Sequence, residues 1–517
     1  MAVFISAAQA AELIKSDSVV GVSGFGGWLG ADLIFAELKK RFLSTGAPSG
    51  LSVFGGILPG DLTEAECGMN YLAQPEMVRE VIAAHVGMPS KFGRLISQNS
   101  VSAFALPLGL VPQFLSAAAG KRPGVLSKIG LETFIDPRVE GGALNDAAKM
   151  TGKSVCKLIS MDGEEYLFYS AIHPDACILR VSTADRNGSL SALCDPITAE
   201  QLEMAMAVKA NGGIVIAQAD RITDKLLPRE ILIHSSLVDY VVTDETHSCP
   251  PGYACPTYRP ELWGQGKSEA KFAALSELNV RKICGRRAAF ELKSGDIVNL
   301  GIGIPDTVAA VAAEEGLYSK LLLSVESGPL GGVPVGGVAF GASENPDVIY
   351  RLSDNFNFYD GGGLNIAFLG AGEIDEKGNV NVSKFGTKTT GPGGFINIVQ
   401  NTPAVCFMCT FTVSGLKASA ENGKLTIIRE GSEKKFRKTV GQVTFSGSYA
   451  AKNGQKILYI TERAVFELKD GGLVLTEIAP GIDLEKDILA QMDFKPRISP
   501  CLKLMDERIF KNELMRL

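Results

Sequence analysis

The chain has 517 residues, of which 46% are hydrophobic and 21% charged, as expected of a globular protein with two or more domains. Its net charge of −6, with no basic cluster longer than residues 433–438, argues against a nucleic-acid partner. Residues 1–18 lack the features of a signal peptide, so we expect a cytoplasmic protein. Residues 101–120 are uncharged, but Pro107 and Pro112 would break a membrane span, and we expect a buried strand and loop there.

One pattern of elements occurs twice along the chain, and this predicts two homologous α/β domains. Each copy has the end of a helix, a polar turn, a β-branched strand, a glycine-rich turn, a helical pattern, a second strand and, further on, a strand with a hairpin. In the first copy these lie at residues 11–27, 31–42, 51–56 and 178–191; in the second they lie at 290–305, 306–316, 323–328 and 366–383.

A stretch rich in Pro, Gly and Cys, residues 244–266, has no periodicity and separates the two copies. We therefore predict an N-terminal domain over residues 1–245, a linker over 246–269 and a C-terminal domain over 270–517. Strands that alternate with helices through short glycine turns favour an open, mostly parallel sheet in each domain. Hairpin signals in the last third predict additional antiparallel strands.

Residues 321–332 place one carboxylate, Glu326, at the end of an apolar run and directly before Ser327, Gly328 and Pro329. This pattern is typical of a buried parallel strand that enters a turn. The carboxyl ends of such strands are where ligands bind, so a lone acid there is either a surface-loop charge or a chemical group. The first copy has Phe54 at the matching position, so only the second copy carries the charge.

Glycine-rich turns occur at residues 24–27, 301–305, 361–363 and 391–394. A dinucleotide-binding motif is excluded at 301–305 because Asp306 stands where a third glycine is required. Such turns also expose backbone N–H groups that can stabilise an oxyanion. A desolvated glutamate facing a thioester can attack it and form a mixed anhydride. Glu326 and the glycine turns together therefore favour acyl transfer.

Ten cysteines and four histidines are scattered along the chain. Cys406 and Cys409 have C-x-x-C spacing, but they lie in an apolar, strand-like run without a second ligand pair. We interpret the cysteines as buried free thiols and expect no metal site.

The run SVESGPLGGVP (324–334), with GIGIP (301–305) before it and YDGGGLNIAFLGAGEID (359–375) after it, resembles family I CoA-transferases. The similarity is to the fused single-chain type that includes propionate and acetate CoA-transferases. It implies two fused NagB/RpiA/CoA-transferase-like domains, a homo-oligomer that is often a tetramer, CoA as a substrate, small carboxylic acids as its partners, and no permanently bound cofactor. Further matching stretches lie at residues 130–138, 378–387, 391–398, 447–468 and 479–494.

The resemblance also implies roles for individual residues. Glu326 matches the nucleophilic glutamate, which attacks an acyl-CoA, becomes a glutamyl-CoA thioester and passes CoA to a carboxylate acceptor. Gly393 and Gly394 match the glycine loop of the oxyanion hole. The N-terminal turn matches a loop near the acyl and pantetheine end, and the other glycine turns are further CoA-binding candidates. The full CoA-binding set is Gly24, Phe25, Gly26, Gly27, Gly301, Gly303, Gly361, Gly362 and Gly363.

One position departs from the family pattern. Relatives carry a glutamine whose amide assists the oxyanion, and here that position is Leu108, which cannot donate a hydrogen bond. Either another donor replaces it, with Asn365 and Ser102 as candidates, or the acyl pocket around Leu108 and Trp28 has a changed preference.

Two other functions stay open at this point. An acyl-CoA hydrolase on the same fold would form the same glutamyl intermediate and let water finish the reaction. A non-enzymatic ligand sensor would normally carry a basic DNA-binding segment, and neither end of the sequence shows one. The acids that are exchanged are not predicted.

Overall fold

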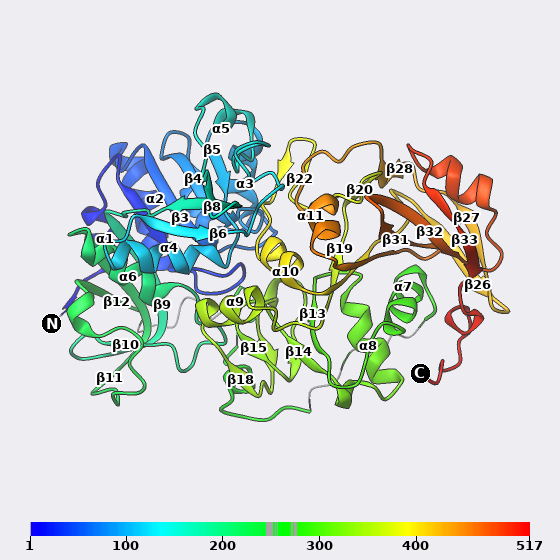
Figure 1. The fold of residues 1–517 in the computed structure, drawn as a ribbon. Coiled ribbons are helices and arrows are strands. Elements are labelled where there is room, and N and C mark those ends of the chain that lie inside the picture. The colour runs from blue at the N-terminus through cyan, green and yellow to red at the C-terminus, as the bar shows by residue number, and fades with distance from the viewer. Residues whose placement is uncertain (1, 245–251, 254, 256, 270–271, 273–276) are drawn as a thin grey trace. The chain divides into compact units, whose positions relative to one another are not determined.

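The computed structural model describes residues 2–517 except 245–251, 254, 256, 270–271 and 273–276 (Figure 1). Parts of the predicted linker, and the first residues of the predicted C-terminal domain, lie outside the described residues. The chain forms two compact units. Unit 1 comprises Met1–Glu269, Val325–Asn357 and Ser383–Asn397; unit 2 comprises Ala270–Ser324, Phe358–Val382 and Ile398–Leu517. Two stretches of the second half of the sequence thus belong to unit 1. The predicted division into two homologous domains, at residues 1–245 and 270–517, stays a prediction.

Unit 1 is built on a parallel sheet with the strand order β1-β12-β11-β9-β2-β3-β4-β5. These strands are β1 (Val3–Phe4), β2 (Val19–Val22), β3 (Leu51–Ile57), β4 (Val78–His85), β5 (Ser102–Ala105), β9 (Ala176–Asp185), β11 (Ile214–Thr223) and β12 (Tyr240–Thr243). β10 (Leu190–Ser191) pairs with β9 as the antiparallel hairpin that the sequence predicts. Every residue of β3 and β9 is buried, as expected for a parallel sheet covered on both faces.

Helices cover this sheet, and unit 1 also contains a separate small sheet. The helices are α1 (Ala7–Leu13), α2 (Asp32–Thr45), α3 (Ser90–Ser97), α4 (Leu110–Ala119), α5 (Asp146–Met150) and α6 (Gln201–Ala210), with 3-10 turns at Gly68–Leu72, Ser235–Leu237 and Pro260–Trp263. A separate antiparallel sheet comprises β6 (Gly124–Ser127), β7 (Lys157–Met161) and β8 (Glu164–Ser170). α4 packs against α6 (Figure 1).

The segments that unit 1 takes from the second half are mostly short strands. They are β15 (Pro329–Leu330), β16 (Val333–Pro334), β17 (Ser343–Glu344), β18 (Val348–Ile349), β22 (Lys384–Phe385) and β23 (Lys388–Thr389), with a 3-10 turn at Gly337–Ala339. α9 (Leu352–Asp360) and α10 (Phe395–Asn401) each begin in unit 1 and end in unit 2.

Unit 2 contains the strand order β14-β13-β19-β24-β30-β31-β32-β33, parallel as far as β30 and antiparallel from β30 to β32. These strands are β13 (Ile297–Leu300), β14 (Leu322–Ser324), β19 (Ile366–Gly370), β24 (Ala404–Met408), β30 (Lys456–Ile460), β31 (Ala464–Lys469), β32 (Gly472–Ile478) and β33 (Arg497–Leu504). The antiparallel strands predicted in the last third are therefore present.

The remaining elements of unit 2 surround this sheet. The helices are α7 (Val280–Ala289), α8 (Asp306–Glu314) and α11 (Gly447–Lys452), with shorter helical turns at Tyr318–Lys320, Leu484–Ile488, Leu489–Gln491 and Glu507–Phe510. The short strands are β20 (Glu373–Asp375), β21 (Val380–Asn381), β25 (Thr412–Val413), β26 (Lys417–Glu421), β27 (Lys424–Arg429), β28 (Glu433–Lys434) and β29 (Phe436–Arg437).

The internal repeat is visible in the order of the strands. Unit 1 contains β12-β11-β9-β2-β3 and unit 2 contains β30-β24-β19-β13-β14, and in each run the neighbouring strands are parallel. The strands also follow one another along the chain in the same order, starting from β2 in unit 1 and from β13 in unit 2, each followed in the sequence by its neighbour β3 or β14. The predicted α/β class with largely parallel sheets is confirmed.

The uncharged segment 101–120 differs from its prediction. It forms β5 and then helix α4, where the sequence suggested a strand and a loop. Pro112 is the third residue of α4, and the first turn of a helix has N–H groups without helical partners, so proline is tolerated there. Among the described residues, no helix is long and apolar enough to cross a membrane.

Candidate active site

Glu326 sits in a tight turn that begins one residue after β14 ends. The Gly328 N–H donates to the Val325 carbonyl at 3.0 Å, and the Val325 N–H donates to the Pro329 carbonyl at 2.9 Å. Gly328 has a φ of +133°, and a Cβ there would lie 2.0 Å from the Tyr350 carbonyl oxygen. A residue with a side chain therefore does not fit at Gly328. The turn fixes the backbone from which the Glu326 side chain extends.

The backbone of this turn is held by a residue that the sequence reasoning missed. Asn355, on α9, is fully buried, and its Nδ2 donates to the carbonyl oxygens of Val325 at 3.1 Å and Glu326 at 2.9 Å. No local motif marks Asn355 as a partner of a residue 29 positions earlier. Both carbonyls would be left without this donor if the amide were removed.

The Glu326 side chain is 8% exposed and faces the glycine loop at residues 391–394. Burial raises its pKa to about 7, and the one opposing contribution is a hydrogen bond from the Gly394 N–H. A Cβ on Gly394 would lie 2.0 Å from Glu326 Oε2, closer than two such atoms can approach. The structure thus places Glu326 and Gly394 in direct contact, and the carboxylate is desolvated.

The glycine loop is fastened to the carboxyl end of β4. The Gly393 N–H donates to the Ala84 carbonyl at 2.9 Å, and the Val86 N–H donates to the Thr390 carbonyl at 2.8 Å. Gly393 has a φ of +55°, which directs its own N–H to β4. The N–H that points to the carboxylate is therefore that of Gly394.

An aromatic ring from α9 fills the space beside the carboxylate. A Cβ on Gly394 would lie 2.8 Å from Phe356 Cζ, and one on Gly109 would lie 2.8 Å from Phe356 Cδ1. The two glycines therefore make room for the Phe356 ring. Phe54, the residue that matches Glu326 in the first repeat, is buried in β3 and packs against Phe114 with ring centroids 5.3 Å apart.

Leu108 is linked to the glycine loop by its backbone. Its N–H donates to the Gly393 carbonyl at 3.1 Å, and the neighbouring Gly109 N–H donates to Asn397 Oδ1 at 3.1 Å. The Leu108 side chain is fully buried and points to Gly56, near the carboxyl end of β3. The position therefore adjoins the candidate site, while its side chain supplies no hydrogen bond.

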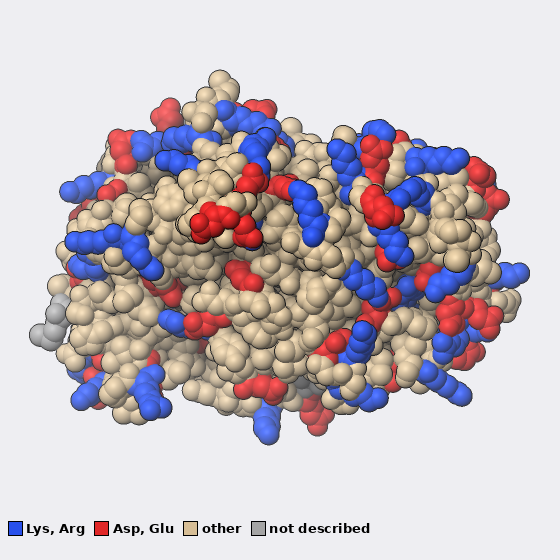
Figure 2. All heavy atoms as spheres, in the orientation of Figure 1, with Lys and Arg blue, Asp and Glu red and all other residues tan. Residues whose placement is uncertain are grey.

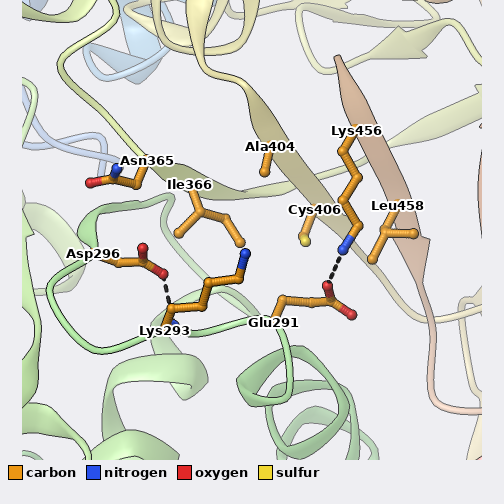
Figure 3. Close-up of a pocket in the computed structure, with 9 residues that line it drawn as sticks. All are labelled: Glu291, Lys293, Asp296, Asn365, Ile366, Ala404, Cys406, Lys456 and Leu458. Atoms are coloured by element: carbon orange, nitrogen blue, oxygen red, sulfur yellow. Dashed lines mark hydrogen bonds and ion pairs between the residues drawn. The ribbon is translucent and has the colours of Figure 1, made fainter. Parts of the chain in front are cut away.

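The two residues considered as replacement donors are engaged elsewhere in the sheets. Ser102 is the first residue of β5 and pairs with Glu80, at the amino end of that strand. Asn365 Oδ1 accepts the Ile297 N–H at 2.8 Å. Asn365 also lines a pocket at the amino-terminal ends of β13, β19, β24 and β30 (Figure 3), the edge opposite to the one where β14 ends. Within unit 1, Ser102 is thus at the opposite end of the strands from Ala84, which holds the glycine loop, and this does not support it as an oxyanion donor. Asn365 belongs to unit 2, and its role as a donor stays a prediction.

The N-terminal glycine turn packs against the chain that follows Glu326 within unit 1. The Phe25 ring stacks on Phe340 with centroids 6.4 Å apart, and the Trp28 indole N–H donates to the Ala339 carbonyl at 3.2 Å. A Cβ on Gly27 would lie 2.1 Å from the Val338 carbonyl oxygen. The turn Gly24–Gly27 is thus buried against residues 338–341.

The remaining CoA-binding candidates belong to unit 2. The Gly301 N–H donates to the Phe368 carbonyl at 2.8 Å, and the Gly303 N–H, at a φ of +100°, donates to Asp306 Oδ2 at 2.9 Å. Gly361, Gly362 and Gly363 follow α9, and a Cβ on Gly363 would meet the Phe358 ring at 2.2 Å. Their role toward CoA stays a prediction.

Charges on the face shown in Figure 2 are mixed, with Lys and Arg side chains interspersed among Asp and Glu.

Cys406 and Cys409 are buried free thiols with raised pKa values, the pKa of Cys409 rising to about 11. In the part of the chain that the structure describes, no group of three or more His, Cys, Asp or Glu side chains could hold a metal ion.

Comparisons with known proteins point to one family. Residues 4–244 match the family model described as Coenzyme A transferase. The chain is 42% identical to a caffeate CoA-transferase of Acetobacterium woodii, over 99% of this chain and 98% of the relative. It is 41% identical to the acetate CoA-transferase YdiF of Escherichia coli O157:H7, over 99% of this chain and 96% of the relative.

Solved structures agree with this similarity. The acyl-CoA transferase YdiF from E. coli O157:H7, as a thioester complex with CoA, matches with a TM-score of 0.91 and 38% identity, over 100% of this chain and 97% of that chain. The apoenzyme of the same protein matches with a TM-score of 0.92.

Proposed function

Since this chain belongs to the coenzyme A transferase family, we propose that it moves CoA from a short-chain acyl-CoA to a free carboxylic acid, with Glu326 as the nucleophile. The observation that carries the proposal is the buried Glu326 carboxylate in contact with the Gly394 N–H, in a chain whose fold matches a CoA thioester complex along its whole length. Neither a redox group nor ATP is needed, because one thioester is exchanged for another.

The reaction runs through two half-reactions. The Glu326 carboxylate attacks the carbonyl carbon of the acyl-CoA, the C–S bond breaks, and CoA thiolate leaves a mixed anhydride on the glutamyl group. The thiolate then attacks the glutamyl carbonyl, which releases the acyl group as a carboxylate and leaves a glutamyl-CoA thioester. The acceptor carboxylate reverses these steps, so a new acyl-CoA departs and the Glu326 carboxylate is restored.

The residues around Glu326 suit these steps. The Gly394 N–H that contacts the carboxylate can also donate to the oxyanion of a tetrahedral intermediate, where a preorganised backbone donor contributes most. Burial behind Phe356 raises the energy of the carboxylate and increases its nucleophilicity. Asn355 holds the backbone of the turn, so the carboxylate stays in one position through both half-reactions.

No observation favours the alternative, an acyl-CoA hydrolase. That enzyme would need a water beside the glutamyl thioester, whereas Glu326 is 8% exposed and is flanked by the Phe356 ring. The acids exchanged are proposed only as a class, carboxylic acids, because one relative is named for caffeate and another for acetate. We further propose a cytoplasmic homo-oligomer, a tetramer by family resemblance, which light scattering on the purified protein tests directly.

The function is tested by intact-mass and peptide mass spectrometry after incubation with propionyl-CoA in the absence of an acceptor. We expect a CoA adduct on the peptide that contains Glu326, discharged by acetate with formation of acetyl-CoA. Glu326→Gln is the matched control and should form no adduct. An adduct that decays without an acceptor would establish the hydrolase instead, and an unmodified Glu326 across a panel of acyl-CoAs would refute the proposal.

A further inference from the structure

A second buried glutamate lies two contacts away from the glycine loop. Glu200 directly precedes α6 and is fully buried. Its Oε1 accepts the N–H of Gly56, the last residue but one of β3, at 3.2 Å. Its Oε2 has no hydrogen-bond partner among the described residues. A buried carboxyl oxygen without a donor is unfavourable when ionised, but it can carry a proton.

Leu108 lies on the same side of this part of β3. If Gly56 had a Cβ, that atom would lie 3.1 Å from Glu200 Oε2 and 3.1 Å from Leu108 Cδ1. The carboxyl group and the leucine methyl therefore both pack closely on Gly56, which leaves little room for a side chain there. Leu108 in turn donates its N–H to the Gly393 carbonyl at 3.1 Å, and Gly394 contacts Glu326.

We propose that Glu200 is a positioning residue of the transfer reaction: in its protonated form it holds Gly56 of β3, against which Leu108 packs, and through Leu108 it fixes the Gly393–Gly394 loop against Glu326. This inference rests on the proposed function. It also accounts for a leucine where the family carries a glutamine, because an apolar side chain packs beside a neutral carboxyl group without needing a partner.

The surroundings of Glu200 keep it neutral. Burial raises its pKa to about 8, and Glu203 one turn further along α6 raises it slightly more, against the N–H groups of Gly56 and of Glu200 itself. α4, which packs on α6, has no ionisable side chain in residues 110–119. On the chain that follows Glu326, Arg351 lies 3.6 Å from Glu203 and pairs with Asp354 at 2.9 Å.

Two other charged groups border this region from the sheet. Arg180 on β9 is paired with Asp220 at 2.9 Å, and its backbone carbonyl lies 3.5 Å from Gln201 Nε2. His85 at the end of β4 is neutral, since burial lowers its pKa to about 4. With a pKa of about 8, Glu200 ionises as the pH rises through that value, and ionisation places a largely desolvated negative charge near Leu108 and Gly56.

The test compares Glu200→Gln with Glu200→Ala in steady-state assays of CoA transfer from propionyl-CoA to acetate between pH 6 and pH 9.5. Glutamine reproduces the shape and hydrogen bonds of the protonated acid but cannot ionise. In the wild type, kcat/KM should fall as the pH rises through about 8. Glu200→Gln should keep kcat at pH 7.5 within about threefold and lose this alkaline fall; Glu200→Ala should lose about tenfold or more in kcat with little change in KM.

Glu203→Gln is the matched control, since it removes a neighbouring carboxylate without touching Gly56. It should retain the alkaline fall and move it to lower pH, because Glu203 raises the pKa of Glu200. Thermal melting of each variant shows that it is folded at the assay temperature.

Two results would overturn the inference while leaving the proposed function intact. One is an alkaline fall in Glu200→Gln identical to that of the wild type. The other is a Glu200→Gln enzyme as inactive as Glu200→Ala, because the ionised form would then be the required one. Failure of the proposed function is a different result: the wild type would form no CoA adduct on Glu326.

Discussion

The α-carbon of Gly394 lies so close to the Glu326 carboxylate that a methyl group there would stand 2.0 Å from Oε2. Gly394 is not among the residues with positive φ, so an alanine suits its backbone, and the closeness to Glu326 is what excludes a side chain. A substitution of Gly394 therefore disturbs the contact with Glu326 without straining the backbone of the glycine loop.

Gly394→Ala should reduce kcat by about 100-fold or more, because the carboxylate must move away from its one oxyanion donor. Gly393→Ala is the instructive comparison. Its Cβ would meet nothing within 4 Å, but its φ of +55° costs an alanine about 1 kcal/mol. Gly393→Ala should thus lower the melting temperature more than the rate, in paired thermal melts and assays. The reverse ranking would contradict the geometry.

The pH dependence of the first half-reaction should report Glu326. Its pKa is raised to about 7 in the free enzyme, mainly by burial, so the side chain is a neutral acid below that value and a nucleophile above it. We expect kcat/KM for propionyl-CoA to rise about tenfold per pH unit below pH 7 and to flatten between pH 7 and pH 8, before the alkaline fall expected from Glu200. A rate that stays constant from pH 5 to pH 7 would show that the carboxyl group is ionised throughout.

Glu326 should also weaken the folded state at neutral pH. Its folded pKa lies above the unfolded value, so at pH below about 4.5 both states are protonated and the residue has no effect. As the pH rises from 4.5 to 7, the unfolded chain releases the proton first and unfolding becomes easier, by roughly 3 kcal/mol at most above pH 7. Glu326→Gln should therefore melt at a higher temperature than the wild type at pH 8, and at the same temperature at pH 4.5.

Asn355 should be needed for both stability and rate. Asn355→Ala removes the side-chain donor to the Val325 and Glu326 carbonyls, of which Val325 keeps the Gly328 N–H, at a cost of about 1–3 kcal/mol of stability, and it loosens the turn that carries Glu326. We expect kcat to fall at least tenfold. Asn355→Asp, ionised, would direct a negative charge at both carbonyl oxygens, so its melting temperature should lie below that of Asn355→Ala at pH 8 and recover at pH 5.

The α/β class with mostly parallel sheets was predictable because it depends on local patterns. A β-branched run, a glycine turn and a helical pattern specify each repeat, and Glu326 stands out as a charge at the end of an apolar strand. The hydrogen bonds that support the turn and the glycine loop around Glu326 could not be predicted in this way. Asn355, Ala84 and Glu200 act through hydrogen bonds to backbone groups that are distant in sequence, and nothing in their local sequence indicates which backbone group they meet. The same reason limits the prediction for Ser102, whose residue type is suitable for a donor but which lies at the amino end of β5.

Leu108 provides the test of acyl preference. Its side chain is fully buried between Gly56 and the glycine loop, and it has the polar Glu200 Oε2 as a neighbour. A glutamine amide at this position can donate to Glu200 or toward an oxyanion, whereas leucine excludes both. We expect Leu108→Gln to change the ratio of kcat/KM for propionyl-CoA over hexanoyl-CoA by at least about threefold.

Leu108→Met is the matched control for this change. It keeps an apolar side chain of similar volume, which buried sites usually tolerate, and should leave the ratio close to that of the wild type. If Leu108→Gln alters neither the rate nor the ratio, Leu108 does not contribute to the acyl pocket, and the departure from the family pattern affects packing alone. If both variants alter the ratio equally, the shape of the pocket matters and its hydrogen bonding does not.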